Sequence, residues 1–321
     1  MGSNAKGALL ALLSFGIFAT HDVIVKTLGA HYSPFQIVFF SVLFGFPMVT
    51  LLLIRDPEPG HLRPVHPWWT ALRTLAGVVT GASAFYAFST LPLAQTYAIL
   101  FAAPLIITIL SIPILGETVR LRRWLAVIVG LCGVIVVLRP GVTEFQLGHL
   151  AALVAAVGSA LASIIVRKIG RDERSVVLLL YPMLANFAIM ACLLPLVYKP
   201  MPLGHLAGVA AMSIMAFSAS AIIVAAYKAG EAVIVAPMQY SQILWATLYG
   251  VWFFDEVPDG MTAIGAGIII ASGVYIVLRE GRPNASTHTP VLQNKSRLET
   301  GVTPRISSWL RLTRRDGEAE S

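Results

Sequence analysis

The feature that most constrains this chain is an internal repeat, because its back half restates its front half. Residues 93–141 read LAQTYAILFAAPLIITILSIPILGETVRLRRWLAVIVGLCGVIVVLRPG, and residues 231–281 read EAVIVAPMQYSQILWATLYGVWFFDEVPDGMTAIGAGIIIASGVYIVLREG. Each copy is an apolar run closed by a glutamate, Glu117 or Glu256, then a short turn and a second run that ends in GV-x-x-VLR-x-G. If each half holds five membrane spans, an odd number, the second copy enters the membrane in the opposite orientation. Inverted repeats of this kind are typical of secondary transporters.

The composition places the chain in a lipid bilayer. Apolar residues make up 57% of the sequence, charged residues 12%, and the mean hydropathy is +0.78, whereas a soluble domain carries roughly 25% charged residues. The apolar runs are continuous and span-sized, which predicts helices and not alternating barrel strands. Ten spans are expected, near 7–28, 35–54, 68–90, 94–115, 122–138, 147–168, 175–197, 203–226, 232–254 and 260–279. The predicted fold class is therefore an all-α integral membrane protein with ten transmembrane helices in an inverted repeat of five plus five.

The basic residues predict the orientation of these spans. With both termini in the cytoplasm, the inner loops hold Lys6, Arg55, Arg63, Arg120, Arg122, Arg123, Arg167, Lys168, Arg171, Arg174 and Lys228. The outer side then holds only Lys26, Arg139 and Lys199. This bias follows the positive-inside rule. The net charge of +7 thus reflects topology, and no nucleic-acid partner is expected.

The repeat also predicts the domain organisation. We expect a first five-helix repeat over 1–141, a second, inverted repeat over 142–281, and a basic cytoplasmic tail over 282–321 that is mostly disordered. Near the end of that tail, the segment 305–315 alternates apolar and arginine residues at helical spacing. Two interpretations stay open for it: a short helix on the anionic inner leaflet, or a solvated basic tail.

Motifs for enzymatic chemistry are missing from the sequence. It contains no Walker-type phosphate loop, no HExxH and no dinucleotide-binding fingerprint. Cys132 and Cys192 fall inside predicted spans and lack metal-ligand spacing, so we expect both to be packing residues without a disulfide or metal. We therefore expect no cofactor and no enzyme; an intramembrane enzyme and an ion channel are kept as remote alternatives.

Two segments carry a family resemblance. They are LPLAQTYAILFAAPL followed by LGE at 115–117, and APMQYSQILWATLYGVWFFDEVP at 236–258. In these segments the chain resembles ten-span members of the drug/metabolite transporter superfamily with two EamA-type domains, and the likeness covers about residues 7–280. The resemblance implies a carrier whose central cavity is lined mainly by spans 1, 3, 4, 6, 8 and 9, with spans 5 and 10 at the periphery.

One departure from that family pattern is visible in the second span. Many relatives read FFR where this chain reads Phe39, Phe40 and Ser41. Any role of that arginine is absent here or is taken by Arg73 at the start of the third span.

Ionisable residues within a span are costly and therefore indicate function. Asp22 is the only acid well inside a predicted span, and Lys26 lies four residues further on the same helix face. Asp22 either pairs with Lys26 and fixes the first span, or acts as a carboxylate that senses a proton or the substrate. His21 adjoins Asp22, but successive helical side chains point about 100° apart. We therefore expect a packed, hydrogen-bonded histidine in preference to a His/Asp dyad or a proton relay.

The ninth span is the richest in polar and aromatic groups. Gln239, Gln242 and Trp245 follow each other at a spacing of three, which places them on one helix face. Pro237 precedes them and is expected to bend or break the helix, as in many transporter binding sites. The two amides either line a cavity or join helices by hydrogen bonds.

The fourth span carries the counterpart of this row in Gln95, Tyr97 and Phe101, and Tyr86 in the third span is a further candidate for the cavity. Glu117 and Glu256 are expected to pair with nearby basic residues or to favour a helix N-terminus; a gating role follows only if each closes its own side. A row of small residues in the last span, Ala263, Gly267 and Ala271, predicts close helix packing and leaves a homodimer open.

Taken together, these features predict a secondary-active or facilitative permease of the cell inner membrane. It would move a small organic metabolite by alternating access, with efflux of an amino acid or related solute as the expectation from the family. Uptake of a nucleoside-like compound such as S-adenosylmethionine is the alternative. The expected partners are the small-molecule substrate and the lipid bilayer.

Overall fold

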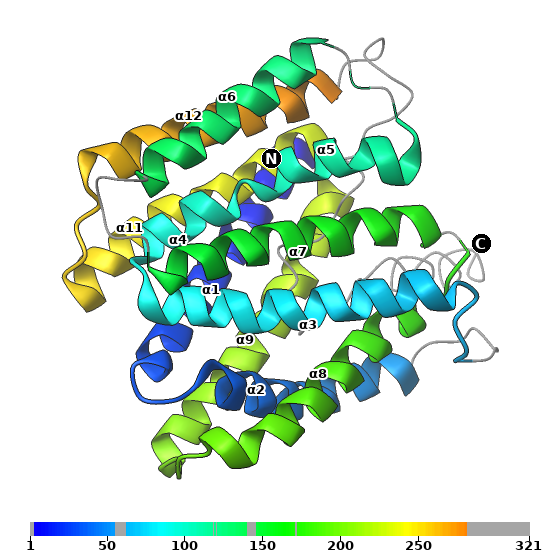
Figure 1. Cartoon of the computed structure of the whole chain (residues 1–321), viewed down its shortest axis with the longest axis vertical. Coiled ribbons are helices and arrows are strands. Elements are labelled where there is room, and N and C mark those ends of the chain that lie inside the picture. The colour runs from blue at the N-terminus through cyan, green and yellow to red at the C-terminus, as the bar shows by residue number, and fades with distance from the viewer. Residues whose placement is uncertain are drawn as a thin grey trace.

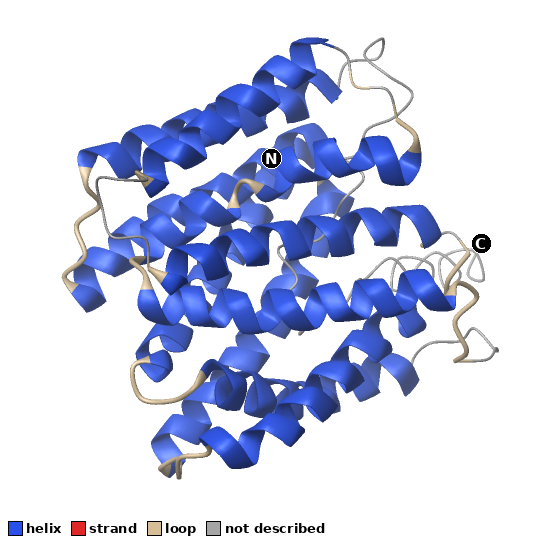
Figure 2. Cartoon of the chain, viewed as in Figure 1, coloured by secondary structure: helices blue, strands red, loops and turns tan. Residues whose placement is uncertain are grey.

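The structure is a computed structural model that describes residues 3–54, 62–117, 119, 121–139, 146–170 and 172–280. Within these ranges every regular element is a helix and no strand occurs (Figure 2). The expected tail, with its candidate membrane-surface helix, lies outside the described residues, as do the loop arginines Arg55, Arg120 and Arg171.

Helices occupy the positions that the apolar runs predict. They are α1 (Ser3–Gly29), α2 (Pro34–Ile54), α3 (Pro67–Thr90), α4 (Leu93–Leu100), α5 (Ala103–Leu115), α6 (Leu121–Leu138), α7 (Leu147–Ile169), α8 (Ser175–Val197), α9 (Leu203–Ala229), α10 (Ala232–Val235), the 3₁₀ helix η1 (Ala236–Tyr240), α11 (Ser241–Phe254) and α12 (Gly260–Glu280). Eight segments of the described chain are long and apolar enough to cross a membrane, with α4 and α5 counted together, and α2 adds a shorter apolar stretch. The chain is therefore a multi-pass membrane protein.

Two of the predicted spans are not continuous helices. The span predicted at 94–115 is interrupted at Phe101 and Ala102, between α4 and α5, and Pro104 follows directly. The span predicted at 232–254 changes from α10 to the 3₁₀ segment η1, which contains Pro237, before α11 begins. Proline lacks a backbone donor, so it interrupts the helical hydrogen-bond ladder. Broken helices within a bilayer are tolerated where protein or a cavity surrounds them, and here they lie at corresponding places in the two halves.

The helix packing respects the sequence repeat. Figure 1 shows α6 beside α12 along one edge of the bundle and α2 beside α8 at the opposite edge. Between these edges α1 packs on α9 and on α10–α11, while α3 packs on α7, and α4–α5 also pack on α7. When each helix is exchanged for its counterpart in the other half, α1·α9 becomes α7·α3 and the contact of α1 with α10–α11 becomes that of α7 with α4–α5. Each of these contacts joins the two halves, and each has a counterpart related to it by the repeat.

Close backbone approaches hold the edge pair α6·α12 together. A Cβ added at Gly265 of α12 would lie 2.7 Å from the carbonyl oxygen of Gly133 in α6, and one added at Gly133 would lie 2.9 Å from that of Gly265. Both positions therefore accept only glycine at this helix spacing. The predicted small row Ala263, Gly267 and Ala271 lies instead on the exposed face of α12. That face is free of contacts with the rest of the described chain at Gly267, where an added Cβ would meet no atom within 4 Å.

The two cysteines correct one expectation. Cys132 in α6 and Cys192 in α8 were predicted to pack inside the bundle, but both side chains are exposed on its outer surface. Both lie within helices that are apolar around most of their circumference, so composition does not reveal which face turns inward. The two thiols are separate and free.

Candidate functional site

A chain of hydrogen bonds joins three helices in the interior of the bundle. Asp22 of α1 accepts a hydrogen bond from the hydroxyl of Tyr97 in α4, and the Gln242 amide of α11 donates to that same hydroxyl at 3.2 Å. His21 Nδ1 lies 2.7 Å from the other carboxylate oxygen of Asp22. All four side chains are about 1% exposed. We call these four residues the central polar cluster.

The cluster overturns one sequence-based expectation. His21 and Asp22 were predicted to point apart because they are neighbours on a helix, yet their side chains meet at 2.7 Å. Both side chains are long enough to bend toward each other, and burial favours a contact between an imidazole and a carboxylate. The expected hydrogen-bonded histidine is thus present, with Asp22 itself as its partner.

Aromatic rings surround the cluster. The Tyr97 ring packs 5.3 Å from Phe88 and 5.8 Å from Phe101, and Phe101 packs edge-on against Tyr240 at 5.1 Å. Phe101 and Tyr240 lie at the breaks of the two discontinuous helices. On the other side the His21 ring meets Phe85 of α3 edge-on at 6.2 Å. Polar groups so enclosed have strengthened electrostatic interactions, because the surroundings screen them poorly.

The predicted row on the ninth span is divided by the helix break. Gln239 belongs to the 3₁₀ segment η1 and is half-buried, whereas Gln242 and Trp245 belong to α11. Gln242 enters the central polar cluster. Trp245 packs against Gly16 of α1, where an added Cβ would lie 3.4 Å from the indole. The two amides of the row therefore differ in their surroundings, since Gln242 is fully buried and Gln239 is not.

Lys26 has a different partner from the expected one. Its ammonium lies 2.7 Å from Glu256 Oε1, after α11, and donates to the Leu91 carbonyl at 2.5 Å. The other Glu256 oxygen accepts the backbone N–H of Leu93 at 3.0 Å, at the N-terminus of α4. The predicted Asp22–Lys26 pair is therefore replaced, because a partner that caps a helix and sits nearer water competes for the lysine. Glu256 behaves as predicted for a paired, helix-capping acid.

A second ion pair closes the opposite end of the bundle. Glu117, after α5, pairs with Arg167 in the last turn of α7. Lys168 beside it donates to the Ile114 carbonyl at 2.6 Å, and its ammonium lies 4.5 Å from the Trp69 ring centre. The prediction that Glu117 pairs with a nearby basic residue is confirmed. We refer to the two ends of the bundle as the Glu117 end and the Glu256 end.

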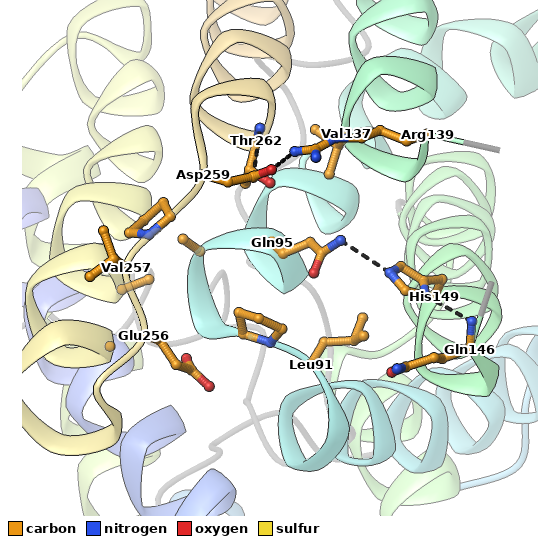
Figure 3. A pocket seen from close by; sticks show the side chains of 15 residues that line it. Leu91, Gln95, Val137, Arg139, Gln146, His149, Glu256, Val257, Asp259 and Thr262 are labelled. Atoms are coloured by element: carbon orange, nitrogen blue, oxygen red, sulfur yellow. Dashed lines mark hydrogen bonds and ion pairs between the residues drawn. The ribbon is translucent and has the colours of Figure 1, made fainter. Parts of the chain in front are cut away.

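A cavity of about 420 Å³ opens at the Glu256 end (Figure 3). Gln95 of α4 lines it and lies 3.0 Å from His149 Nε2 in α7, and the backbone N–H of Gln146 donates to His149 Nδ1 at 3.1 Å. Across the cavity Arg139 pairs with Asp259, which also caps α12 by accepting the Thr262 N–H at 3.1 Å. The predicted candidate Gln95 is thus at the Glu256 end and apart from the central polar cluster.

Sequence reasoning missed several of these residues. His149 lies in the first turn of α7, at the margin of a predicted span, so it was not treated as a candidate. Arg139 directly follows α6 and Asp259 directly precedes α12, and only the folded bundle brings them together. Tyr86 is half-buried in α3, and its carbonyl accepts hydrogen bonds from Ser89 and Thr90. Among the described residues, no three His, Cys, Asp or Glu side chains come together as a metal site.

Arg73 takes an interior position in α3. It is 2% exposed and donates a hydrogen bond to the carbonyl of Leu178 in α8. In α2, Ser41 receives a hydrogen bond at its carbonyl from Ser213 of α9 at 3.0 Å. The Arg73 guanidinium thus joins α3 to α8, and the Ser41 backbone joins α2 to α9.

Comparison with known proteins identifies the class of the chain. The chain matches the EamA-like transporter family twice, over residues 5–139 and 146–279. The chain is 27% identical to the S-adenosylmethionine uptake transporter of Rickettsia prowazekii over 88% of this chain and 96% of that protein. It is 26% identical to the pseudopaline exporter of Pseudomonas aeruginosa, over 84% and 95% of the two chains. It is also 28% identical to the riboflavin transporter of Vibrio cholerae, over 74% and 85%.

A solved crystal structure shares the fold. It superposes with a TM-score of 0.56 at 21% sequence identity and covers 86% of this chain and 97% of its own. At that identity the likeness concerns the arrangement of helices. Two matches to one transporter family, a shared fold and several apolar spans all point to a membrane transporter and not to an enzyme.

Proposed function

Because the chain belongs to the EamA-like transporter family, we propose that it carries a small organic metabolite across the cytoplasmic membrane by alternating access. The central polar cluster is the single observation that carries this proposal. A carboxylate buried among membrane helices is costly, and is retained where it serves a solute or ion path. Here Asp22 connects α1 and α4 of the front half with α11 of the back half.

The place of the cluster supports this role. Tyr97 lies in α4 ahead of the break at Phe101, and Gln242 lies in α11 just after the 3₁₀ segment η1. Discontinuous helices at the interface of two repeats are where secondary transporters bind their substrates. A solute with hydrogen-bonding groups could replace the Gln242–Tyr97–Asp22 bonds one by one. Because these bonds link the two halves, their exchange would loosen one arrangement of the halves and favour the other.

The inverted repeat and the orientation belong to the same proposal. Helix contacts that map onto one another between the halves support a five-plus-five repeat. An inverted repeat gives two equivalent packings that open at opposite membrane faces. We place both termini in the cytoplasm on the basic-residue bias, and the exposed small row of α12 is the surface for a homodimer, if one forms.

Two substrate classes are proposed. The first is an amino acid or related solute moved outward, as the sequence resemblance leads us to expect. The second is S-adenosylmethionine moved inward, which is supported by curated relatives of that name with nearly full-length matches. Both carry charged and hydrogen-bonding groups that suit a cluster of carboxylate, phenol and amide.

Transport by the purified protein in liposomes tests this proposal. Solute-loaded vesicles should accelerate uptake of the labelled solute, and the rate should saturate with concentration, as counterflow through a carrier requires. Gln242→Ala should lower the transport rate while the melting temperature stays nearly unchanged. Gln239→Ala is the companion variant from the half-buried 3₁₀ segment. A flux that rises linearly with solute concentration, as through a channel, would contradict a carrier. Full activity of both variants would show that this region is not part of the solute path.

A further inference from the structure

The cavity at the Glu256 end lies outside the central polar cluster. It forms where α4 and α7 begin, α6 and α11 end, and the loop before α12 passes over them (Figure 3). Its volume of about 420 Å³ falls within the range of small-molecule sites, roughly 300–1,000 Å³. The cavity therefore has room for a metabolite or for a large part of one.

The walls of the cavity differ in chemistry. The side formed by α11 and the following loop carries the carboxylates of Glu256 and Asp259, while α4 and α7 contribute the Gln95 amide and the His149 imidazole (Figure 3). Leu91, Pro92, Val137, Val257 and Pro258 provide the apolar surface between them. Such a combination of apolar walls with a few convergent polar groups is typical of ligand sites.

The acidic side chains of the lining offer acceptors to a cation. Two carboxylates line the cavity against a single guanidinium, that of Arg139, which is already paired with Asp259. Glu256 is balanced by Lys26, which reaches it from α1 and is not part of the lining. An ionised carboxylate has about four acceptor sites, so each of these two can accept a further donor from a bound cation beside its present partners.

Glu256 connects the cavity to the helix bundle. Its carboxylate is shared between the cavity surface, the Lys26 ammonium of α1 and the Leu93 N–H at the start of α4. A cation that binds in the cavity would compete with Lys26 for that carboxylate. Lys26 is not left without an acceptor, because the Leu91 carbonyl and the Phe254 ring, 5.2 Å from its ammonium, remain in place.

From these contacts we infer that the cavity is a recognition site for a small organic cation that also carries hydrogen-bonding groups. Glu256 and Asp259 bind the positive charge of the ligand. Gln95 and His149 form hydrogen bonds with its polar groups. A cation bound in the cavity weakens the ion pair between Glu256 and Lys26, which makes it easier for the Glu256 end to open. This inference rests on the proposed transport function and adds a second binding site to it. A solute would occupy this site before or after it reaches the central polar cluster.

Cysteine protection in the full-length protein tests the site directly. Cys132 and Cys192 are replaced by serine, and Val257→Cys then places one thiol at the cavity. Val257 is 79% exposed, and Leu203→Cys, at an 82% exposed position that does not line the cavity, is the matched control. The labelling rate with a membrane-impermeant maleimide is measured in proteoliposomes. The probes are three pairs that differ in positive charge: S-adenosylmethionine with S-adenosylhomocysteine, choline with dimethylbutanol, and arginine with citrulline.

We expect at least one cation to slow labelling of Val257→Cys, by about tenfold at ten times its Kd, while its neutral counterpart does not. Labelling of Leu203→Cys should not change. Glu256→Gln and Asp259→Asn, which keep their hydrogen-bonding shape, should each abolish the discrimination between cation and neutral counterpart. The inference is overturned if none of the cations protects, or if the neutral counterparts protect equally well. Because protection reports binding and counterflow reports transport, failure of this site can be distinguished from failure of the proposed transport function.

Discussion

The two ends of the bundle use the same local structure but differ in what surrounds it. Gly116 and Asp255 each end a helix in the left-handed conformation, with φ of 71° and 54°, and the next residue is a glutamate in both cases. The backbone N–H of Glu117 donates to the Ser111 carbonyl at 3.3 Å, and that of Glu256 donates to the Gly250 carbonyl at 2.9 Å. Each bond runs from a residue to the carbonyl six positions back, and this shared helix ending places each carboxylate against a basic residue of another helix.

The surroundings of the two glutamates are different. The Glu117 side chain is 5% exposed and its partner Arg167 14%, whereas Glu256 is 21% exposed and borders the cavity. A capping motif that recurs in the repeat is thus placed in a tighter environment at one end and a more open one at the other. The sequence repeat thus specifies the local backbone geometry at both ends. The packing around each glutamate determines how easily its ion pair separates.

Removing one partner should affect the two ends unequally, and this is the largest effect we predict. Glu117→Gln leaves the Arg167 guanidinium poorly compensated in a buried place, which typically costs about 3–5 kcal/mol. Glu256→Gln should cost less, about 1–3 kcal/mol, because this carboxylate is 21% exposed and Lys26 keeps the Leu91 carbonyl and the Phe254 ring as partners. Thermal unfolding of the detergent-purified variants measures both. Equal losses would remove the distinction between the two ends.

Charge exchange sharpens the comparison at the more open end. Lys26→Glu alone sets two carboxylates against each other, whereas Lys26→Glu combined with Glu256→Lys restores an attractive pair. We expect an interaction free energy of about 0.5–3 kcal/mol in the double-mutant cycle for unfolding. Partial recovery of transport in the double variant should accompany it. A double variant no better than the sum of its single variants would show that Lys26 and Glu256 act independently.

The central polar cluster lies between the two ends and should control transport more than stability. Asp22→Asn removes the charge that Tyr97 and His21 share, and a hydrogen bond to a charged group contributes about 1.5–3 kcal/mol. The groups that contact Asp22 include His21 on its own helix and Tyr97 from α4, which in turn accepts a hydrogen bond from the uncharged Gln242 of α11. If Asp22 carries a coupling proton, the transport rate of the parent depends on pH and that of the variant does not. A variant that is only less stable, with the parental pH profile, would assign Asp22 a structural role.

The smallest effect concerns the edge pair α6·α12, which should stay packed whichever end opens. Gly265→Ala brings a methyl group to within 2.5 Å of Val137 and 2.7 Å of the Gly133 backbone, so we expect a loss of about 1–3 kcal/mol from overpacking. Gly267→Ala, two residues further on the open face, should be neutral or stabilising by up to about 1 kcal/mol. The two melting temperatures distinguish the faces. A similar loss at Gly267 would mean that another surface, such as a second copy of the chain, covers it.

Much of the fold was predictable from the sequence because each element is specified locally. Continuous apolar runs place the helices, and Pro237 correctly predicts the interruption in the ninth span. The apolar–Glu–turn pattern led to paired acids at Glu117 and Glu256, which the structure contains. These features depend on backbone chemistry and on short-range sequence, so a single chain suffices to find them.

The contacts of the candidate site were less predictable because they depend on helix rotation and register. Spans that are apolar around their whole circumference do not indicate which face turns inward, so Cys132 and Cys192 were misplaced and Lys26 was assigned the wrong partner. Tyr97 and Gln242, far apart in sequence, meet only through the packing of α4 on α11. Of the cavity residues, the sequence indicates only Gln95 as a solute contact, because the other polar ones lie where helices begin or end and do not stand out as buried polar groups.

Alternating access requires that the two ends of the bundle open in turn around the central polar cluster. Spin labels at Thr27 and Val257 report the Glu256 end, and labels at Lys168 and Leu121 report the Glu117 end, all at exposed positions. Pulsed electron–electron distance measurements in proteoliposomes, with and without transported solute, follow both pairs. If the ends alternate, solute shifts the two distance distributions in opposite directions, one toward longer and the other toward shorter distances. Two distributions that stay fixed, or that lengthen together, would contradict it.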